Sequence, residues 1–180
     1  MKTYISILRG INVSGQKKII MTDLKTLYED LGFEDVITYI QSGNVVFKSS
    51  KKMTDTKLAK MIEEKIVEKY DFQVPVIIRT LDELKRATEI NPYKNDNIDG
   101  LYITFLSNAP NSINLEKLDN INFLPDQFEI IGKEIFLNCV SYGNTKLSNN
   151  FFESKLKVIA TTRNIKTVQK LIELTNDSNQ

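Results

Sequence analysis

Residues 9–18 are the part of the sequence whose residue types and spacing come closest to a known chemistry, phosphate binding. Gly10 and Gly15 have the spacing of the two glycines in a Walker A loop, but Gln16 stands where that motif needs its lysine. Lys17 stands where the motif needs the Ser or Thr that holds Mg²⁺. ATP hydrolysis by the Walker mechanism is therefore not expected.

A looser anion site in this segment remains a hypothesis. Glycines let backbone N–H groups approach an anion, and cationic side chains beside them add charge. The candidate ligand-binding residues in this segment are Arg9, Gly10, Asn12, Lys17 and Lys18. The alternative is a surface turn whose cations are solvated.

A second candidate segment lies between two predicted strands, at residues 39–44. Gln41 and Asn44 would present their amides to a ligand at the end of a sheet, with Ser42 beside them. The alternative is ordinary hairpin chemistry, in which Ser42 and Gly43 make the turn and Asn44 caps it through local hydrogen bonds.

Two further segments, residues 142–148 and 160–164, each end at a predicted helix start. Helix N-termini offer unbonded N–H groups and the positive end of the helix dipole, so they attract anions. Cations are unfavourable there, which suggests that a negative ligand binds beside them. The candidate residues are Lys146, Thr161, Thr162, Arg163 and Asn164. The alternative is that Ser148 and Asn164 are simple N-caps and that Arg163 is solvated.

The composition excludes several classes of chemistry. The chain has no His and one Cys, which excludes Ser-His-Asp and Cys-His nucleophiles, His-based zinc sites and an internal disulfide. Cys139 lies in an apolar run and is expected to be a buried small hydrophobe. Carboxylate-bound Mg²⁺ stays open. No catalytic residue, metal site or cofactor is predicted.

The charge and hydrophobicity of the chain are ordinary for a globular protein. Its 180 residues are 41% hydrophobic and 26% charged, with a net charge of +1, so any anion site must be a local cluster. No apolar run approaches the ~20 residues that span a bilayer, and the start does not resemble a signal peptide. With a single cysteine, these features predict a cytoplasmic protein that does not enter a membrane.

The pattern of apolar residues predicts two related α+β halves. Strands are predicted over 3–8, 36–41, 44–48 and 74–80, and helices over 22–31, 54–70 and 81–90. The order β-α-β-β-α-β is that of a ferredoxin-like unit. In the second half, strands are predicted over 101–107, 127–131 and 134–140, and helices over 112–120, 148–157 and 164–174.

The second order, β-α-β-β-α-α, nearly repeats the first in topology, without a convincing repeat in the residues. We therefore expect an α+β fold of two ferredoxin-like-related halves, with mainly antiparallel sheets covered by helices. The predicted boundaries are an N-terminal half at 1–90, a linker at 91–100 that contains Pro92, and a C-terminal half at 101–180.

Several of these segments, in this order and spacing, resemble a known family. They are Leu8–Val13, Thr38–Phe47, Tyr142-Gly143 with Lys146-Leu147, and Ala160–Asn164. They are similar to the bacterial domain-of-unknown-function family 1697, over nearly the whole chain. The resemblance implies a small cytoplasmic α+β protein and supplies no activity, substrate or catalytic residue. Family members carry an aromatic residue where this chain has Ile165, which weakens a stacking role at that position.

Three functions remain open from the sequence. The first is binding of a phosphorylated ligand, a nucleotide or a nucleic-acid backbone, by the basic and Gly/Asn-containing loops. One version stacks RNA bases on Tyr4 and Phe47, although the motif of RNA-recognition modules is missing. The second is an enzyme that acts on a small phosphorylated or acidic substrate without His. The third is a protein–protein interaction module, which an exposed apolar patch or an uncovered strand edge near Pro75 would favour.

Overall fold

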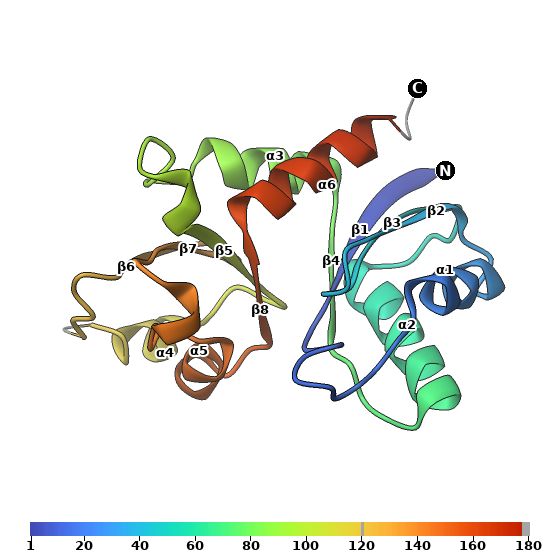
Figure 1. Cartoon of the computed structure of the whole chain (residues 1–180), viewed down its shortest axis with the longest axis horizontal. Coiled ribbons are helices and arrows are strands. Elements are labelled where there is room, and N and C mark those ends of the chain that lie inside the picture. Colours follow the sequence, from blue (N-terminus) through green and yellow to red (C-terminus); the bar gives the residue numbers. More distant parts are fainter. Residues whose placement is uncertain (120, 178–180) are drawn as a thin grey trace. The chain divides into compact units, whose positions relative to one another are not determined.

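Strands and helices are interspersed along the whole chain in a computed structural model that describes residues 1–119 and 121–177 (Figure 1). The first half contains β1 (Lys2–Leu8), α1 (Met21–Asp30), β2 (Glu34–Tyr39), β3 (Asn44–Ser49), α2 (Asp55–Tyr70), β4 (Val76–Arg79) and α3 (Leu81–Glu89). The second contains β5 (Leu101–Leu106), α4 (Ser112–Glu116), β6 (Gln127–Ile131), β7 (Glu134–Asn138), α5 (Asn149–Leu156), β8 (Ala160–Asn164) and α6 (Ile165–Asp177). Two 3₁₀-helices, η1 (Ile98–Gly100) and η2 (Tyr142–Asn144), lie in the second half.

The strands form two four-stranded antiparallel sheets with the same order. The first sheet runs β2-β3-β1-β4 and the second runs β6-β7-β5-β8, which is the ferredoxin-like order in both halves. The expected α+β fold of two related halves is therefore confirmed. By their internal contacts, Met1–Lys85 together with the chain from Lys170 form unit 1, and Arg86–Gln169 form unit 2. The sequence-based boundaries at 91–100 stay a prediction.

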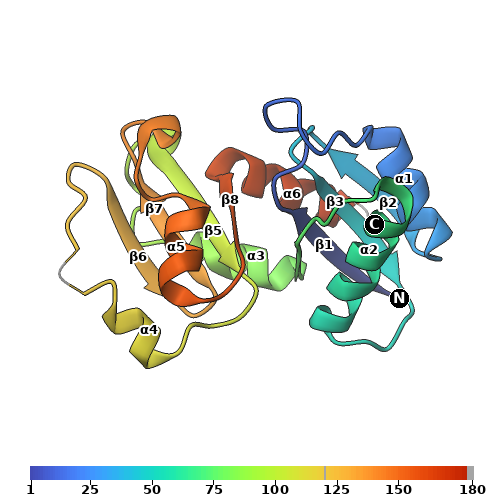
Figure 2. The same cartoon turned by 90° about the horizontal axis from the view of Figure 1, so that it is seen from below.

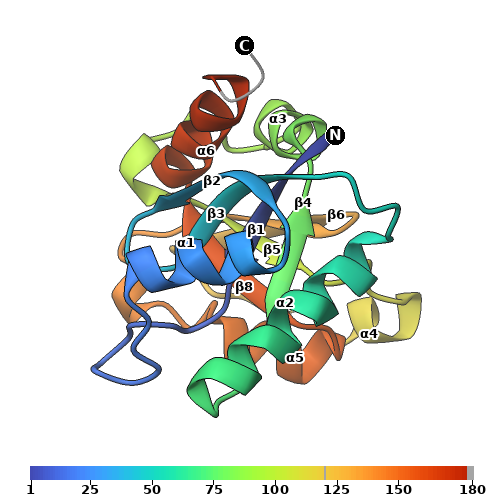
Figure 3. The same ribbon diagram turned by 90° about the vertical axis from the view of Figure 1, so that its right-hand side faces the viewer.

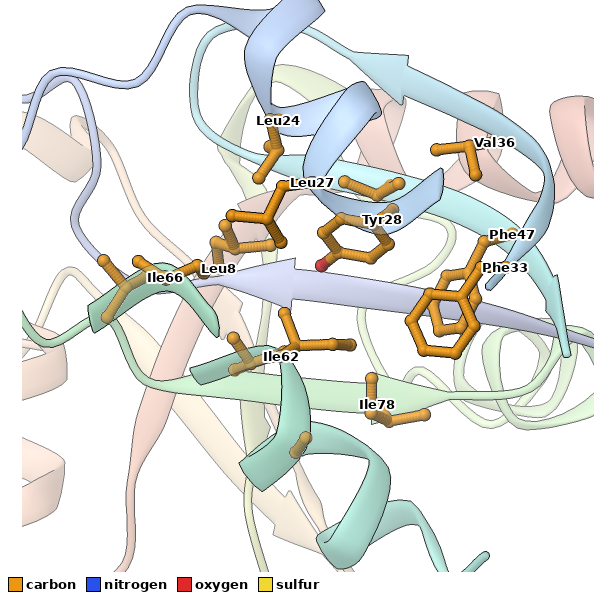
Figure 4. Packing of buried hydrophobic residues seen from close by; sticks show 14 of the residues in the cluster. Leu8, Leu24, Leu27, Tyr28, Phe33, Val36, Phe47, Ile62, Ile66 and Ile78 are labelled. Atoms are coloured by element: carbon orange, nitrogen blue, oxygen red, sulfur yellow. The ribbon is translucent and has the colours of Figure 1, made fainter. Parts of the chain in front are cut away.

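Helices α1 and α2 cover one face of the sheet in unit 1 (Figure 3). Successive strand residues point to opposite faces, so Tyr4, Ser6 and Leu8 of β1 face these helices. Tyr28 of α1 lies above them and its ring is 5.3 Å from that of Phe47 (Figure 4). Its hydroxyl is 2.6 Å from the Ser6 hydroxyl, and burial raises the pKa of Tyr28. The hydrogen bond gives the buried phenol a partner.

The RNA-stacking hypothesis for Tyr4 and Phe47 is wrong. The two rings stack on each other with centroids 5.8 Å apart, and both side chains belong to the core beneath the helices. Their exposed fractions are 5% and 0%, so neither can offer a face to a base. The cause is the alternation along β1 and β3, which turns both positions toward α1 and α2.

In unit 2, α5 packs on the sheet (Figure 2), and α4 contacts α5. Phe152 of α5 is fully buried there, and its ring lies 5.6 Å from that of Phe128. Cys139 is 2% exposed, as expected for a small hydrophobe. Burial first, and then the charge of Asp126, raises the pKa of the Cys139 thiol to about 11, so the thiol stays protonated near neutral pH.

The two halves also repeat in their backbone hydrogen bonds. At the end of the central strand, the Leu8 N–H donates to the Gly43 carbonyl at 2.9 Å, and the Leu106 N–H donates to the Lys133 carbonyl at 2.9 Å. The next residue donates to the residue before the last strand, from Arg9 to Pro75 and from Ser107 to Ile159, both at 2.9 Å. The sequence predicted a repeat only in the order of the elements, and the structure shows that the backbone hydrogen bonds at the ends of these strands repeat as well.

Side chains on the last strands repeat in the same way. Glu63 of α2 accepts the first N–H of β4 at 2.8 Å, and Glu153 of α5 accepts the first N–H of β8 at 2.9 Å. Three residues further, Arg79 and Arg163 each donate to the carbonyl of the preceding residue, at 3.0 and 2.9 Å. Both arginines are buried, and each precedes a residue whose side chain caps the next helix.

The structure corrects the prediction for the end of the chain, which missed strand β8. Residues Ala160–Asn164 pair with β5, so the second order is β-α-β-β-α-β-α rather than β-α-β-β-α-α. The segment holds Thr, Arg and Asn where a strand with one buried face has alternating apolar residues, and this hid the strand from the periodicity. Helix α4 ends at Glu116, earlier than expected, and position 120 lies outside the described residues.

Over residues 1–119 and 121–177, the structure contains no helix with the length and apolar character needed to cross a bilayer.

Replacing Gly43 with Ala should destabilise the fold strongly. Gly43 has a φ of +82°, and a Cβ there would lie 2.6 Å from Ile11 Cδ1 and 2.9 Å from Leu8 Cβ. The clash and the left-handed backbone together should lower the free energy of unfolding by about 2 kcal/mol or more, measured by urea denaturation. Gly132→Ala is the matched control, because Gly132 has a φ of +64° and no atom within 4 Å. It should cost about 1 kcal/mol. Equal losses in the two variants would contradict the packing argument.

Candidate functional site

The two halves differ in the length of two loops at one end of the sheet in unit 1. The connection from β1 to α1 covers residues 9–20, whereas the equivalent connection from β5 to α4 covers only 107–111. The loop from β2 to β3 covers 40–43, against 132–133 in the second half. The longer β1–α1 loop, in dark blue, extends beyond the end of the sheet (Figure 3). Both extended loops belong to the sequence segments that were candidates for ligand binding.

Asn12 joins these two loops through its side-chain amide. Its Oδ1 accepts the N–H of Ile19 at 2.9 Å, and its Nδ2 donates to the carbonyls of Ile19 and Gln41, each at 2.9 Å. The amide therefore closes the β1–α1 loop on itself and ties it to the β2–β3 loop. Asn12 is a positioning residue here, because its amide is bonded within the protein.

The β1–α1 loop needs an unusual number of left-handed residues. Gly10 and Gly15 have φ of +69° and +75°, and Asn12, Ser14 and Lys17 have φ of +56°, +50° and +45°. Non-glycine residues in this region each cost about 1 kcal/mol, so the surrounding bonds must hold them there. One such bond runs from Lys17 Nζ to the carbonyl of Gln73 at 2.7 Å. Lys17 thus anchors the loop.

Helix α1 begins without a side-chain cap. Its N-cap residue is Ile20, whose extended backbone, φ −74° and ψ 135°, is normal for the position but whose side chain accepts no hydrogen bond. The other five α-helices of the described chain each have a side-chain cap, from Thr54, Thr80, Asn111, Ser148 and Asn164. The N–H groups in the first turn of α1 are therefore left to solvent or to a ligand.

A hollow of about 320 Å³ lies at this helix start. Its lining consists of Asn12, Gly15, Lys18, Ile19, Ile20 and Gln41. Lys18 is exposed and makes no ion pair with any residue that the structure describes. Asp23, the acidic residue in the first turn of α1, does not line the hollow. Burial raises the pKa of Tyr70, and the negative charge of Asp23 raises it further. The lining thus combines one cation and a glycine with Ile20, the N-cap residue of the uncapped helix.

The other first-half candidates have structural roles. Arg9 is half-buried and its N–H bonds to Pro75. Asn44 is fully buried, and its Nδ2 donates to the Tyr39 carbonyl at 3.0 Å and to the Ser42 hydroxyl at 3.2 Å. These are the local hydrogen bonds of the hairpin alternative. Gly10 lies in the loop outside the lining, and Lys18, Asn12 and Gln41 are the predicted residues that the structure brings to the hollow.

Most of the candidate ligand-binding residues in unit 2 have side chains that are hydrogen-bonded within the protein. Arg163 was expected in a loop at a helix start, but it lies in β8 and is 8% exposed. Its NH1 donates to the Thr161 hydroxyl at 3.1 Å and to the Thr162 carbonyl at 2.9 Å, and burial lowers the pKa of Arg163 to about 10. It therefore stays charged at neutral pH. The local cause is strand pairing with β5, which the polar sequence of β8 did not reveal.

Thr162 and Asn164 also have partners within unit 2. The Thr162 hydroxyl lies 2.7 Å from that of Thr104 and donates to Asn149 Oδ1 at 2.7 Å. Asn164 Oδ1 accepts the Thr167 N–H at 2.7 Å, which is an N-cap of α6. Lys146 is exposed in the segment before α5.

Sequence reasoning missed Ile19 and Ile20. The signal that could have found them is the lack of Ser, Thr, Asn or Asp at positions 17–21, immediately before the helix predicted over 22–31. Among residues 1–119 and 121–177, no group of three or more His, Cys, Asp or Glu side chains is placed to hold a metal ion.

Asn12→Ala should loosen the hollow without unfolding the sheet. The variant removes three hydrogen bonds of about 1 kcal/mol each and puts Ala at a φ of +56°. Amide hydrogen exchange at Ile19, whose N–H bonds to Asn12, should become at least about tenfold faster. Asn144→Ala is the control, because the Asn144 side chain has only a long 3.4 Å bond to Ser141. Unchanged exchange at Ile19 would refute the role given to Asn12.

Comparison with known proteins supports the fold. A solved structure described as that of the conserved bacterial protein SP0830 from Streptococcus pneumoniae has a TM-score of 0.74 to this chain and 21% sequence identity, over 96% of this chain and 98% of that one. At this identity the likeness shows a shared fold. No protein with curated annotation matches the sequence. Residues 1–136 match the sequence profile of DUF1697, whose description is "Protein of unknown function". This chain therefore belongs to the DUF1697 family.

Proposed function

We propose that the protein binds a phosphorylated small molecule, with a phosphate at the start of α1. The observation that carries this proposal is the meeting of two loops at Asn12. Both loops are longer than their equivalents in the second half, and together they border a hollow at an uncapped helix. In the second half, where the loops are short, Asn111 caps the equivalent helix and its Oδ1 accepts the Asn114 N–H at 2.8 Å.

The groups around the hollow suit a phosphate monoester. The first-turn N–H groups of a ten-residue helix carry the positive end of its dipole, which attracts anions. Gly15 has no side chain to block approach of the ligand, and Lys18 adds a full charge. The Asn12 bonds hold the loop in place before the ligand arrives, which reduces the entropy lost on binding.

The size and rim of the hollow favour a nucleotide or sugar phosphate over a long nucleic acid. A volume of about 320 Å³ lies at the lower end of the range for small-molecule sites. Val13, Ile20 and Ile40, in or beside the two loops, are 57%, 65% and 44% exposed. Such apolar surface beside a phosphate site suits the less polar part of a ligand, for example a base.

Lys18→Gln should weaken binding of a phosphorylated probe. We expect 5′-AMP to raise the melting temperature of the protein and adenosine to have a smaller effect, because adenosine lacks the phosphate. In calorimetry, Lys18→Gln should raise the Kd for 5′-AMP about tenfold, the loss of one charge-assisted contact. Lys25→Gln is the control, because Lys25 lies on α1 and pairs with Glu29 at 3.8 Å. The proposal fails if neither 5′-AMP nor ribose 5-phosphate binds, or if both variants lose affinity equally.

Ile20→Asn should separate stability from binding. A capping side chain at this position should satisfy a first-turn N–H group and raise the free energy of unfolding by about 1 kcal/mol. The same side chain would occupy the phosphate position, so affinity for 5′-AMP should fall. Ile113→Asn removes another exposed isoleucine, 68% exposed, from a helix that Asn111 already caps. Urea denaturation and calorimetry measure the two effects, and a gain in stability with unchanged affinity would place the ligand elsewhere.

A further inference from the structure

A larger hollow, of about 590 Å³, lies at the opposite end of the same sheet. Its lining includes Lys2 at the start of β1 and residues 49–54, which connect β3 to α2. In the register of β1 and β3, Lys2 pairs with Ser49, whereas Ile7 pairs with Asn44 near the first hollow. The two hollows are therefore separated by the length of β1.

The charge at this hollow is positive and uncompensated. Lys2, Lys51 and Lys52 line it, and no carboxylate is among the described residues that do so. Lysines elsewhere make ion pairs with acidic residues, among them Lys25, Lys48, Lys60, Lys65, Lys166 and Lys170. Within the described part of the chain the three lysines of the hollow make none. For a chain of net charge +1, this is a local excess of cations.

The backbone that carries these lysines is held in place. The Lys51 N–H donates to the hydroxyl of Ser49 at 3.1 Å, and Ser49 is 3% exposed. At the other end of the connection, Thr54 caps α2 by accepting the Lys57 N–H at 3.3 Å. The Lys2 Nζ lies 5.0 Å from the ring centroid of Tyr4, a cation–π contact that orients its ammonium group. The backbone of this connection and the ammonium group of Lys2 are thus held beside the hollow.

We propose that this hollow binds a small molecule that carries two or more linked phosphates. Lysine binds phosphate as a point charge, and three uncompensated lysines match the charge of an oligophosphate better than that of a single phosphate. The volume of 590 Å³ is within the range of small-molecule sites and accommodates more than one phosphate. This site does not depend on the α1 site, since the two share no residue.

The test is calorimetry with inorganic tripolyphosphate on the whole chain. Lys51→Gln combined with Lys52→Gln should raise the Kd at least about tenfold. The control is Lys57→Gln combined with Lys60→Gln, which makes the same charge change on α2 outside the lining and should leave the Kd within about twofold. Lys18→Gln should also leave it unchanged, which separates this site from the α1 site. In NMR titrations, the amides of Ser49 and Lys51 should shift on addition of tripolyphosphate.

Three results would overturn the proposal. Equal losses in the Lys51/Lys52 and Lys57/Lys60 variants would indicate general attraction to a positive surface. Loss of tripolyphosphate binding only in Lys18→Gln would assign all binding to the hollow at α1. Binding of a single-stranded DNA 12-mer without binding of tripolyphosphate would indicate a nucleic-acid surface instead.

Discussion

The central strand of each sheet is hydrogen-bonded on both sides up to its last residue, and this constraint fixes where the chain leaves the sheet. Leu8 donates to the residue before β3, and Arg9 donates to the residue before β4. The second half makes the same two bonds from Leu106 and Ser107. Whatever follows β1 therefore starts from a fixed point beside the β2–β3 loop. The loop and the helix start that follow this strand can therefore differ between the two halves without any change in the sheet.

The loop that follows β1 contains left-handed backbone conformations that the shorter loop after β5 lacks. They include Asn12, Ser14 and Lys17, and the helix that follows the loop begins at Ile20 without a cap. In the second half a short loop ends in Asn111, which caps α4. Local rules of stability tend to fail at functional sites, with compensation from surrounding contacts. The Asn12 amide is such a compensation, because it bonds to both loops.

How far the sequence predicts this structure depends on whether the signal is local. Alternation and helical spacing found β1, α1, α2 and both hairpins, because each carries apolar residues at the spacing typical of its own type of element. Strand β8 escaped because Thr161 and Arg163 are buried in spite of being polar, and their burial comes from packing in the folded chain rather than from apolar character. The correspondence of Arg79 with Arg163 escaped for a similar reason. The preceding residues, Ile78 and Thr162, have different side chains, but in each case the backbone carbonyl accepts the hydrogen bond from the arginine.

The same distinction applies to the candidate sites. Pairs such as Lys25 with Glu29 and Lys60 with Glu64 can be predicted from helical spacing, and they account for ordinary solvated charge. The grouping of the lysines that make no ion pair cannot be predicted from local sequence, because it depends on the folded structure. Lys18 lines a hollow that also includes Asn12 and Gln41, and the Asn12 side chain donates to the carbonyl of Gln41, which lies 29 positions further along the chain. Lys2 joins Lys51 and Lys52 because strand register places it opposite Ser49. Since both arrangements depend on pairing between distant segments, folding selects which cations gather, and composition alone gives only their number.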